Sequence, residues 1–156
     1  MERIEKTVDV DCPVRTAYNQ WTQFESFPKF MSGVKDVRQL DDTHMHWRGE
    51  LWGREKEWDA EITEQIPDRI IAWRSISGDA PNAGAVYFEP LSASRTRVRL
   101  MMEYEPQGVL ENIGDALGAM GTSVQSSVDG FKRYIESRGV EEGGWRGEVR
   151  GSERKL

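Results

Sequence analysis

Apolar and polar residues alternate through most of the middle of the chain, which predicts β-strands with one buried face. Turn-forming residues such as Gly53, Pro67 and Gly78 separate the alternating segments. Because the connections are short, we predict hairpins and an antiparallel sheet. The expected strands are Arg3–Asp11, Val34–Leu40, His44–Trp52, Arg54–Gln65, Arg69–Ser77, Ala83–Pro90 and Ser94–Tyr104.

Near the C-terminus the apolar spacing changes to three or four residues, which is the period of an amphipathic α-helix. We predict one long helix from Gly108 to about Arg138. Several glycines lie inside it, and each costs about 1 kcal/mol of helix propensity relative to alanine. Such a helix needs a large apolar surface beneath it, and the sheet supplies one. Two short helices are expected after the first strand, one opened by Pro13 and one around Pro28.

A curved sheet that grips a single long helix leaves a hollow between the two. The strand pattern points large side chains inward, and the helix contributes its apolar stripe. Any one of these residues fits a plain hydrophobic core, but the set suits the lining of a ligand cavity. The candidates are Trp47, Trp58, Trp73, Phe88, Met102 and Tyr104 from the sheet, and Leu117, Met120, Val124 and Val128 from the helix.

Arg54 and Lys56 fall on the same strand face as Trp58 if the alternation holds. Burying an unpaired cation is costly, so we expect this end of the strand to lie at a solvated mouth. Arg54 is nevertheless a candidate for ligand binding, because a cation at the mouth can hold a carboxylate or polarise a ketone.

The order of the elements and four stretches of sequence resemble the START-like (SRPBCC) superfamily, in particular its bacterial polyketide cyclase/dehydrase and coenzyme-Q-binding branch. The stretches run from Val14 to Met31, Trp58 to Asp68, Ile71 to Ser75 and Phe88 to Leu91. They include a Phe-x-x-Phe-Pro-x-Phe-Met run and a Trp-x-x-x-Ile-Thr run. The resemblance covers residues 1–138 and implies an α+β helix-grip fold: a seven-stranded curved antiparallel sheet around a long C-terminal helix.

Members of this superfamily generally hold hydrophobic small molecules in the hollow. The resemblance therefore implies binding of a lipid-, quinone- or polyketide-like molecule. One alternative is a polyketide aromatase/cyclase or dehydrase, for which Tyr18, Arg54, Lys56, Ser75 and Tyr104 are the polar candidates. An inward arginine bonded to a tyrosine would favour the enzyme, and a cavity lined by carbon would favour the carrier.

Composition excludes some partners. The net charge is −6 and the pI is near 5.1, which disfavours nucleic-acid binding. No apolar run is long enough for membrane insertion, and the charged start lacks the apolar core of a signal peptide, so we expect a cytoplasmic bacterial protein. His44 and His46 share a strand face but have no evident third ligand. We therefore expect no metal and no cofactor.

Residues 139–156 are rich in glycine and charge. We expect them to form a flexible tail, because they offer little apolar surface to bury. Trp145 is the exception, and it supports a second alternative function, protein interaction through the tail. Nothing in the pattern sets the oligomeric state.

Overall fold

The computed structural model describes residues 2–51, 54–78, 81–104, 113–151 and 153–155, without the side chains of residues 51, 113–117 and 153–155. The helices are α1 (Val14–Trp21), the 3₁₀ helix η1 (Phe24–Lys29) and α2 (Ile113–Arg138). The strands are β1 (Glu2–Val10), β2 (Val34–Gln39), β3 (His44–Leu51), β4 (Arg54–Ile66), β5 (Ile70–Gly78), β6 (Asn82–Ser92), β7 (Arg95–Tyr104), β8 (Glu148–Arg150) and β9 (Glu153–Lys155).

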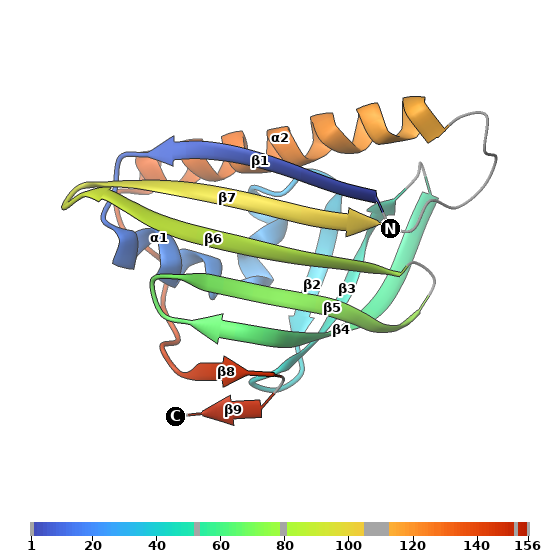
Figure 1. Ribbon diagram of the computed structural model, residues 1–156, viewed down its shortest axis with the longest axis horizontal. Coiled ribbons are helices and arrows are strands. Elements are labelled where there is room, and N and C mark those ends of the chain that lie inside the picture. Colours follow the sequence, from blue (N-terminus) through green and yellow to red (C-terminus); the bar gives the residue numbers. More distant parts are fainter. Residues whose placement is uncertain (1, 52–53, 79–80, 105–112, 152, 156) are drawn as a thin grey trace.

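The main sheet is antiparallel and curled, with strand order β1-β7-β6-β5-β4-β3-β2. The helices lie on its concave side, with α2 running along β1 (Figure 1). This arrangement confirms the predicted helix-grip fold of seven curved antiparallel strands around a long C-terminal helix. Most strand ends fall within one or two residues of the prediction, because period-two alternation is a local property of the sequence. Residues 108–112 of the predicted helix lie outside the described residues.

Alternation also predicts the buried face correctly along most of β4, where Trp58, Ala60 and Ile62 are all buried. The pattern then breaks. The register between β4 and β5 shifts between Ile62 and Glu64, so one extra residue is inserted in β4. As a result Gln65, not Glu64, faces the interior, and it is only 1% exposed.

The core is organised around Trp21 at the end of α1. Its ring lies 5.3 Å from that of Phe27, 5.2 Å from that of Phe30 and 5.1 Å from that of Phe131, measured between centroids. These rings come from α1, η1 and the C-terminal half of α2. The cluster therefore holds three helical segments together on the concave side of the sheet, mostly through edge-to-face contacts.

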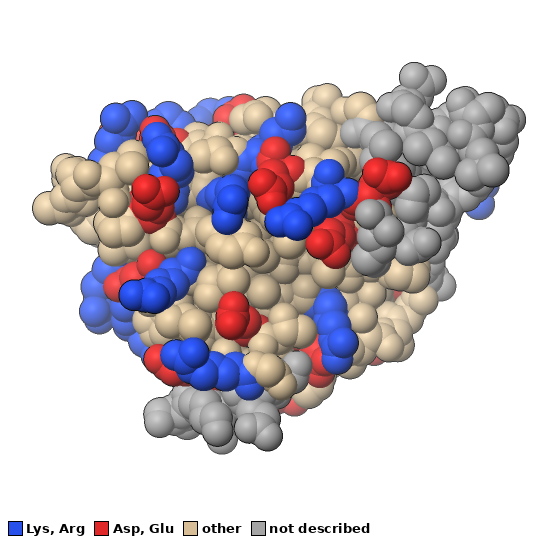
Figure 2. All heavy atoms as spheres, viewed as in Figure 1, with Lys and Arg blue, Asp and Glu red and all other residues tan. Residues whose placement is uncertain are grey.

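The outer face of the sheet is polar and carries interleaved acidic and basic side chains, as Figure 2 shows. Arg97 donates to Asp9 across the β1–β7 pair, with Nε 2.8 Å from Oδ1, and Arg74 pairs with Glu61 between β5 and β4. The outward positions predicted by alternation are thus occupied by cross-strand ion pairs.

The expectation of a flexible tail over residues 139–156 is corrected for its described part, which contains two short strands. Strand β8 pairs with Glu64 and Gln65 of β4, beyond the stretch of β4 that β3 covers, and Val149 is fully buried. The indole of Trp145 is half-buried against the core, and its backbone N–H donates to Thr22 Oγ1 at 3.1 Å. Two features hold this segment in place: the edge of β4 that β3 does not cover, and polar side chains of α1. The composition of the segment indicates neither of them.

Glu142 is the main polar anchor of this segment. Its carboxylate accepts hydrogen bonds from Lys29 Nζ at 2.8 Å, from Tyr134 Oη at 2.5 Å and from Gln20 Nε2 at 3.0 Å. The bonds from Lys29 and Tyr134 lower the pKa of Glu142 from 4.5 to about 2. Because folding lowers this pKa, ionised Glu142 stabilises the fold above pH 4.5, and the contribution disappears as the pH falls towards 2.

We expect Glu142→Gln to lower the free energy of unfolding at pH 7 by about 1 kcal/mol, a modest value because the group is partly solvated. The difference from the wild type should shrink as the pH falls from about 5 towards 2. Urea unfolding at a series of pH values measures both effects. Glu89→Gln, at an exposed position, is the control. A difference that stays constant with pH would contradict the assignment.

Candidate functional site

A cavity lies between the N-terminal half of α2 and the concave face of the sheet. Six of the residues predicted to bind ligand line it: Trp47, Trp58, Met102, Tyr104, Met120 and Val124. Their shared position follows from the fold, because inward residues of β3, β4 and β7 converge beneath the helix. The sequence pattern therefore identified the wall of the cavity on both layers.

Four of the other five predicted residues are described, and they lie outside the lining. Trp73 is covered by Trp47, whose ring centroid is 5.7 Å away, and Phe88 packs edge-on against Tyr18 at 5.3 Å. Val128 is fully buried but is not part of the lining, and Arg54 is exposed at the start of β4. The side chain of Leu117 lies outside the described residues.

The sequence analysis did not predict several of the residues that line the cavity. Three of them, Met31, Ser32 and Gly33, come from the turn after η1, and no periodic signal marks such a turn. Leu100 lies on the inward face of β7 beside Met102. The missed lining residues are Met31, Ser32, Gly33, Val34, Glu50, Asn82, Leu100, Ser123 and Ser127.

The cavity is small. The room open to the centre of a water molecule is about 30 Å³, enough for roughly two waters. Three methionines, Met31, Met102 and Met120, belong to the lining. Because methionine side chains are unbranched and adaptable, this wall can be reshaped more readily than one of branched residues.

Two indoles bring unused hydrogen-bond donors to the cavity. Trp47 and Trp58 stack at 5.9 Å with an interplanar angle of 15°. The Nε1 atom of each is buried and has no hydrogen-bond partner. An unsatisfied buried N–H costs about 1–3 kcal/mol. The wall is therefore apolar over most of its surface, with two donors that lack acceptors.

The two halves of α2 pack very differently. In the C-terminal half, a Cβ added at Gly130 would clash with the Phe30 carbonyl oxygen. In the N-terminal half, a Cβ at Gly118 would meet nothing within 4 Å, and one at Gly121 would meet only Lys6 Cε, at 4.0 Å. The part of the helix that covers the cavity is thus the part with room around it.

The polar residues considered for catalysis are dispersed. Of the five, only Tyr104 lines the cavity, and burial raises its pKa above the usual value. Tyr18 is fully buried beside Phe88, and burial raises its pKa to about 12. Ser75 Oγ accepts a hydrogen bond from the backbone N–H of Asn82 at 3.0 Å. Among the described lining residues there is no lysine or arginine, so the arginine–tyrosine pair expected of a cyclase is not found there.

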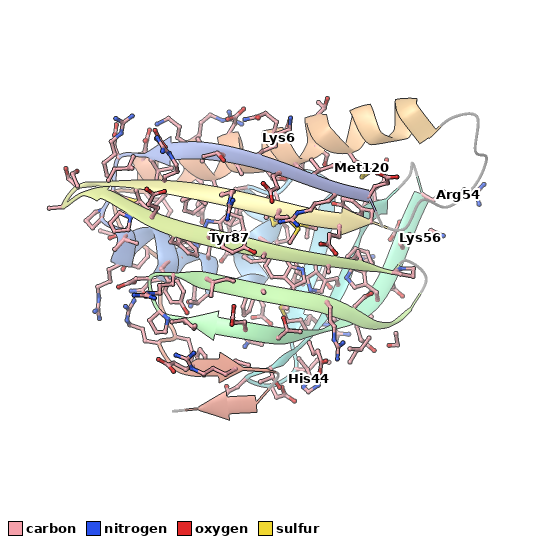
Figure 3. All side chains as sticks on the ribbon, viewed as in Figure 1. Lys6, His44, Arg54, Lys56, Tyr87 and Met120 are labelled. Atoms are coloured by element: carbon pink, nitrogen blue, oxygen red, sulfur yellow. The ribbon has the colours of Figure 1, made fainter. Side chains whose placement is uncertain are left out.

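The two histidines lie on the outer face of the sheet, and Figure 3 shows His44 far from Met120. His46 Nδ1 lies 2.7 Å from Asp59 Oδ1, and His44 Nδ1 lies 2.9 Å from Asp41 Oδ1. Within the described ranges, no three histidine, cysteine or acidic side chains are placed to hold a metal ion together.

Residues 10–130 match the family described as polyketide cyclase / dehydrase and lipid transport. The chain belongs to this family. An uncharacterized 17.2 kDa protein of Streptomyces lincolnensis is 49% identical over 149 residues, which cover 96% of this chain and 99% of that one.

Solved structures agree on the fold. A START superfamily protein from Mycobacterium smegmatis superposes with a TM-score of 0.70 at 15% identity, covering 85% of this chain and 98% of that one. The Zhui aromatase/cyclase from Streptomyces sp. R1128 superposes with a TM-score of 0.71 at 15% identity, covering 92% of this chain and 99% of that one. At these identities the likeness concerns the fold alone. Among the described residues, no helix has the length and apolarity to span a membrane.

The contrast between the halves of α2 gives a matched pair of substitutions. We expect Gly118→Ala to raise the free energy of unfolding by about 1 kcal/mol, since it adds helix propensity in open space. Gly130→Ala should lower it by about 1–3 kcal/mol, because the new methyl group meets the Phe30 backbone. Chemical denaturation of both variants measures the changes. Equal effects at the two sites would contradict the packing described above.

Proposed function

We propose that this protein binds a hydrophobic small molecule of lipid, quinone or polyketide type in the cavity beneath the N-terminal half of α2. The observation that carries the proposal is a mostly apolar lining in which two residues, Trp47 and Trp58, each have a buried indole N–H without a partner. An apolar ligand with carbonyl or ether oxygens would fill the space and accept hydrogen bonds from these donors.

The two indole N–H groups without partners favour a ligand that carries an oxygen acceptor over a pure hydrocarbon. A pure hydrocarbon would leave both N–H groups unsatisfied, whereas an oxygen acceptor recovers about 1 kcal/mol for each bond formed. Trp21 Nε1 also lacks a partner, but Trp21 is part of the helix cluster and not of the cavity lining. Trp47 and Trp58 are therefore the residues whose N–H groups would be available to a bound molecule once the cavity enlarges.

Binding requires the cavity to enlarge. Small-molecule sites usually occupy about 300–1,000 Å³, and this cavity offers about 30 Å³. An outward movement of the N-terminal half of α2 would expose Met120 and Val124 but would break no tight backbone contact at Gly118 or Gly121. The C-terminal half stays fixed by Phe131 and the Trp21 cluster. We infer that α2 acts as a cover hinged near its middle.

Binding is favoured over cyclisation by the described lining. Glu50, at the exposed rim, and Tyr104 are the ionisable side chains in it, and the raised pKa of Tyr104 makes it a hydrogen-bond donor and not a base at neutral pH. Polyketide cyclisation is the second candidate, supported by the family description. A protein-interaction role for the tail has less support, because Trp145 already packs against the core.

A neutral fluorescent probe, N-phenyl-1-naphthylamine, tests occupancy of the cavity. We expect saturable binding to the wild type and at least about tenfold weaker binding to Met120→Trp, whose indole would fill the cavity. Ala119→Trp is the control, because residue 119 is exposed on the same turn of α2. Fluorescence titration gives the dissociation constants. Failure of the wild type to bind, or equal weakening by both variants, would refute the proposed site.

The role of the indole donors is tested with two ligands of similar shape, 2-acetylnaphthalene and 2-ethylnaphthalene. We expect the ketone to bind more tightly by up to about tenfold, the value of one net hydrogen bond. Trp58→Phe should reduce this preference and leave binding of the hydrocarbon nearly unchanged. Competition against the fluorescent probe measures both ligands. Equal affinities for the two in the wild type would show that the donors do not select the ligand.

A further inference from the structure

A second hollow lies beside the cavity, between the edge strand β1 and the N-terminal half of α2. It is an open groove lined by Ile4 and Lys6 on one side and by Gly118, Gly121 and Gln125 on the other. The groove is open to solvent and has a volume of about 630 Å³. A charged group can therefore lie in it without being fully desolvated.

Lys6 is the exception in the pattern of β1. It pairs in register with Leu100, and so occupies the inner face of the sheet where an apolar residue is expected. Its side chain is half-buried, and Cε lies 4.0 Å from the position a Cβ would take on Gly121 (Figure 3). The missing side chain at Gly121 thus leaves room for the lysine stem to lie against the helix.

The charge of Lys6 is unpaired within the described part of the chain. No salt bridge or hydrogen bond joins its ammonium to any described residue. The acidic residue of the groove, Glu5, is engaged elsewhere: its Oε1 lies 2.7 Å from Arg3 Nη2, and its Oε2 lies 3.9 Å from Arg99 Nη1. Among the described residues Lys6 is thus a half-buried cation without a counterion, and such a group favours an anionic partner.

The groove and the cavity are adjacent. Ile4 and Lys6 lie across the β1–β7 ladder from Met102 and Leu100, and both of these line the cavity. On the helix, Met120 faces the cavity and the next residue, Gly121, faces the groove. The same movement of α2 that enlarges the cavity would join the two spaces.

We propose that Lys6 binds an acidic group, a carboxylate or a phosphate, of a ligand whose apolar part occupies the cavity. The ligand is then an amphipathic acid that lies beneath α2, with its charged end in the groove. This inference rests on the proposed function, and it adds the chemical class of the ligand and the residue that selects it.

Two probes that differ in charge and by one methyl group test the inference: 11-(dansylamino)undecanoic acid and its methyl ester. We expect the wild type to bind the acid about tenfold more tightly, as one charge-assisted hydrogen bond predicts. Lys6→Met should abolish the preference for the acid and leave the affinity for the ester unchanged. Lys6→Arg should retain the preference for the acid. Lys56→Met is the control, because it removes the same charge from a half-buried lysine at the start of β4 (Figure 3).

The outcomes separate the two proposals. Ester binding without a preference for the acid, or a preference that survives Lys6→Met, overturns the role of Lys6 and leaves the cavity as a binding site. If Lys56→Met loses the preference for the acid as completely as Lys6→Met does, the preference depends on net charge, and the role of Lys6 is again overturned. Binding of neither probe to the wild type overturns both proposals.

Displacement of the dansyl acid then identifies the acidic group. We expect dodecanoate or dodecyl phosphate to compete more strongly than dodecanol in the wild type and no better than dodecanol in Lys6→Met. The stronger competitor of dodecanoate and dodecyl phosphate indicates whether the site prefers a carboxylate or a phosphate. Equal competition by all three in the wild type would contradict the anionic subsite. Circular dichroism of each variant establishes that the fold is retained.

Discussion

The packing of Trp21 against Phe27, Phe30 and Phe131 is the constraint on which the rest of this structure depends. It joins α1, η1 and the C-terminal half of α2 into one aromatic cluster on the concave side of the sheet. The close approach of Gly130 to the Phe30 backbone belongs to the same contact. The other half of the helix also buries Met120 and Val124 in the core, but it has open space beside Gly118 and Gly121.

That asymmetry creates both functional features. Beneath the N-terminal half of α2, stacked indoles and three methionines line the cavity, and the adjacent groove holds Lys6, which has no ion pair among the described residues. Membership of a family described by polyketide cyclisation and lipid transport is compatible with either binding or chemistry. The described lining contains free N–H donors and no lysine or arginine, and this composition suits recognition of an oxygen-bearing apolar molecule better than proton transfer.

The C-terminal segment shows how order arises without a hydrophobic core of its own. Strand β4 extends past the end of its pairing with β3 and leaves an open edge at Glu64 and Gln65, which β8 covers. Glu142 then ties the segment to Lys29, Gln20 and Tyr134. Each partner is distant in sequence or polar, so a composition-based expectation of disorder had no means of detecting them.

The sequence by itself determined the seven main strands, the long helix and which strand face is buried, because side-chain periods of two and 3.6 are set locally by backbone geometry. It also named six residues of the cavity wall. Only the tertiary structure decided that Trp73 and Phe88, equally inward, are covered by Trp47 and Tyr18. It likewise decided that a bulge turns Gln65 inward and that Lys6 lies against a glycine of α2. These outcomes depend on which elements meet across the core, and no local period encodes that.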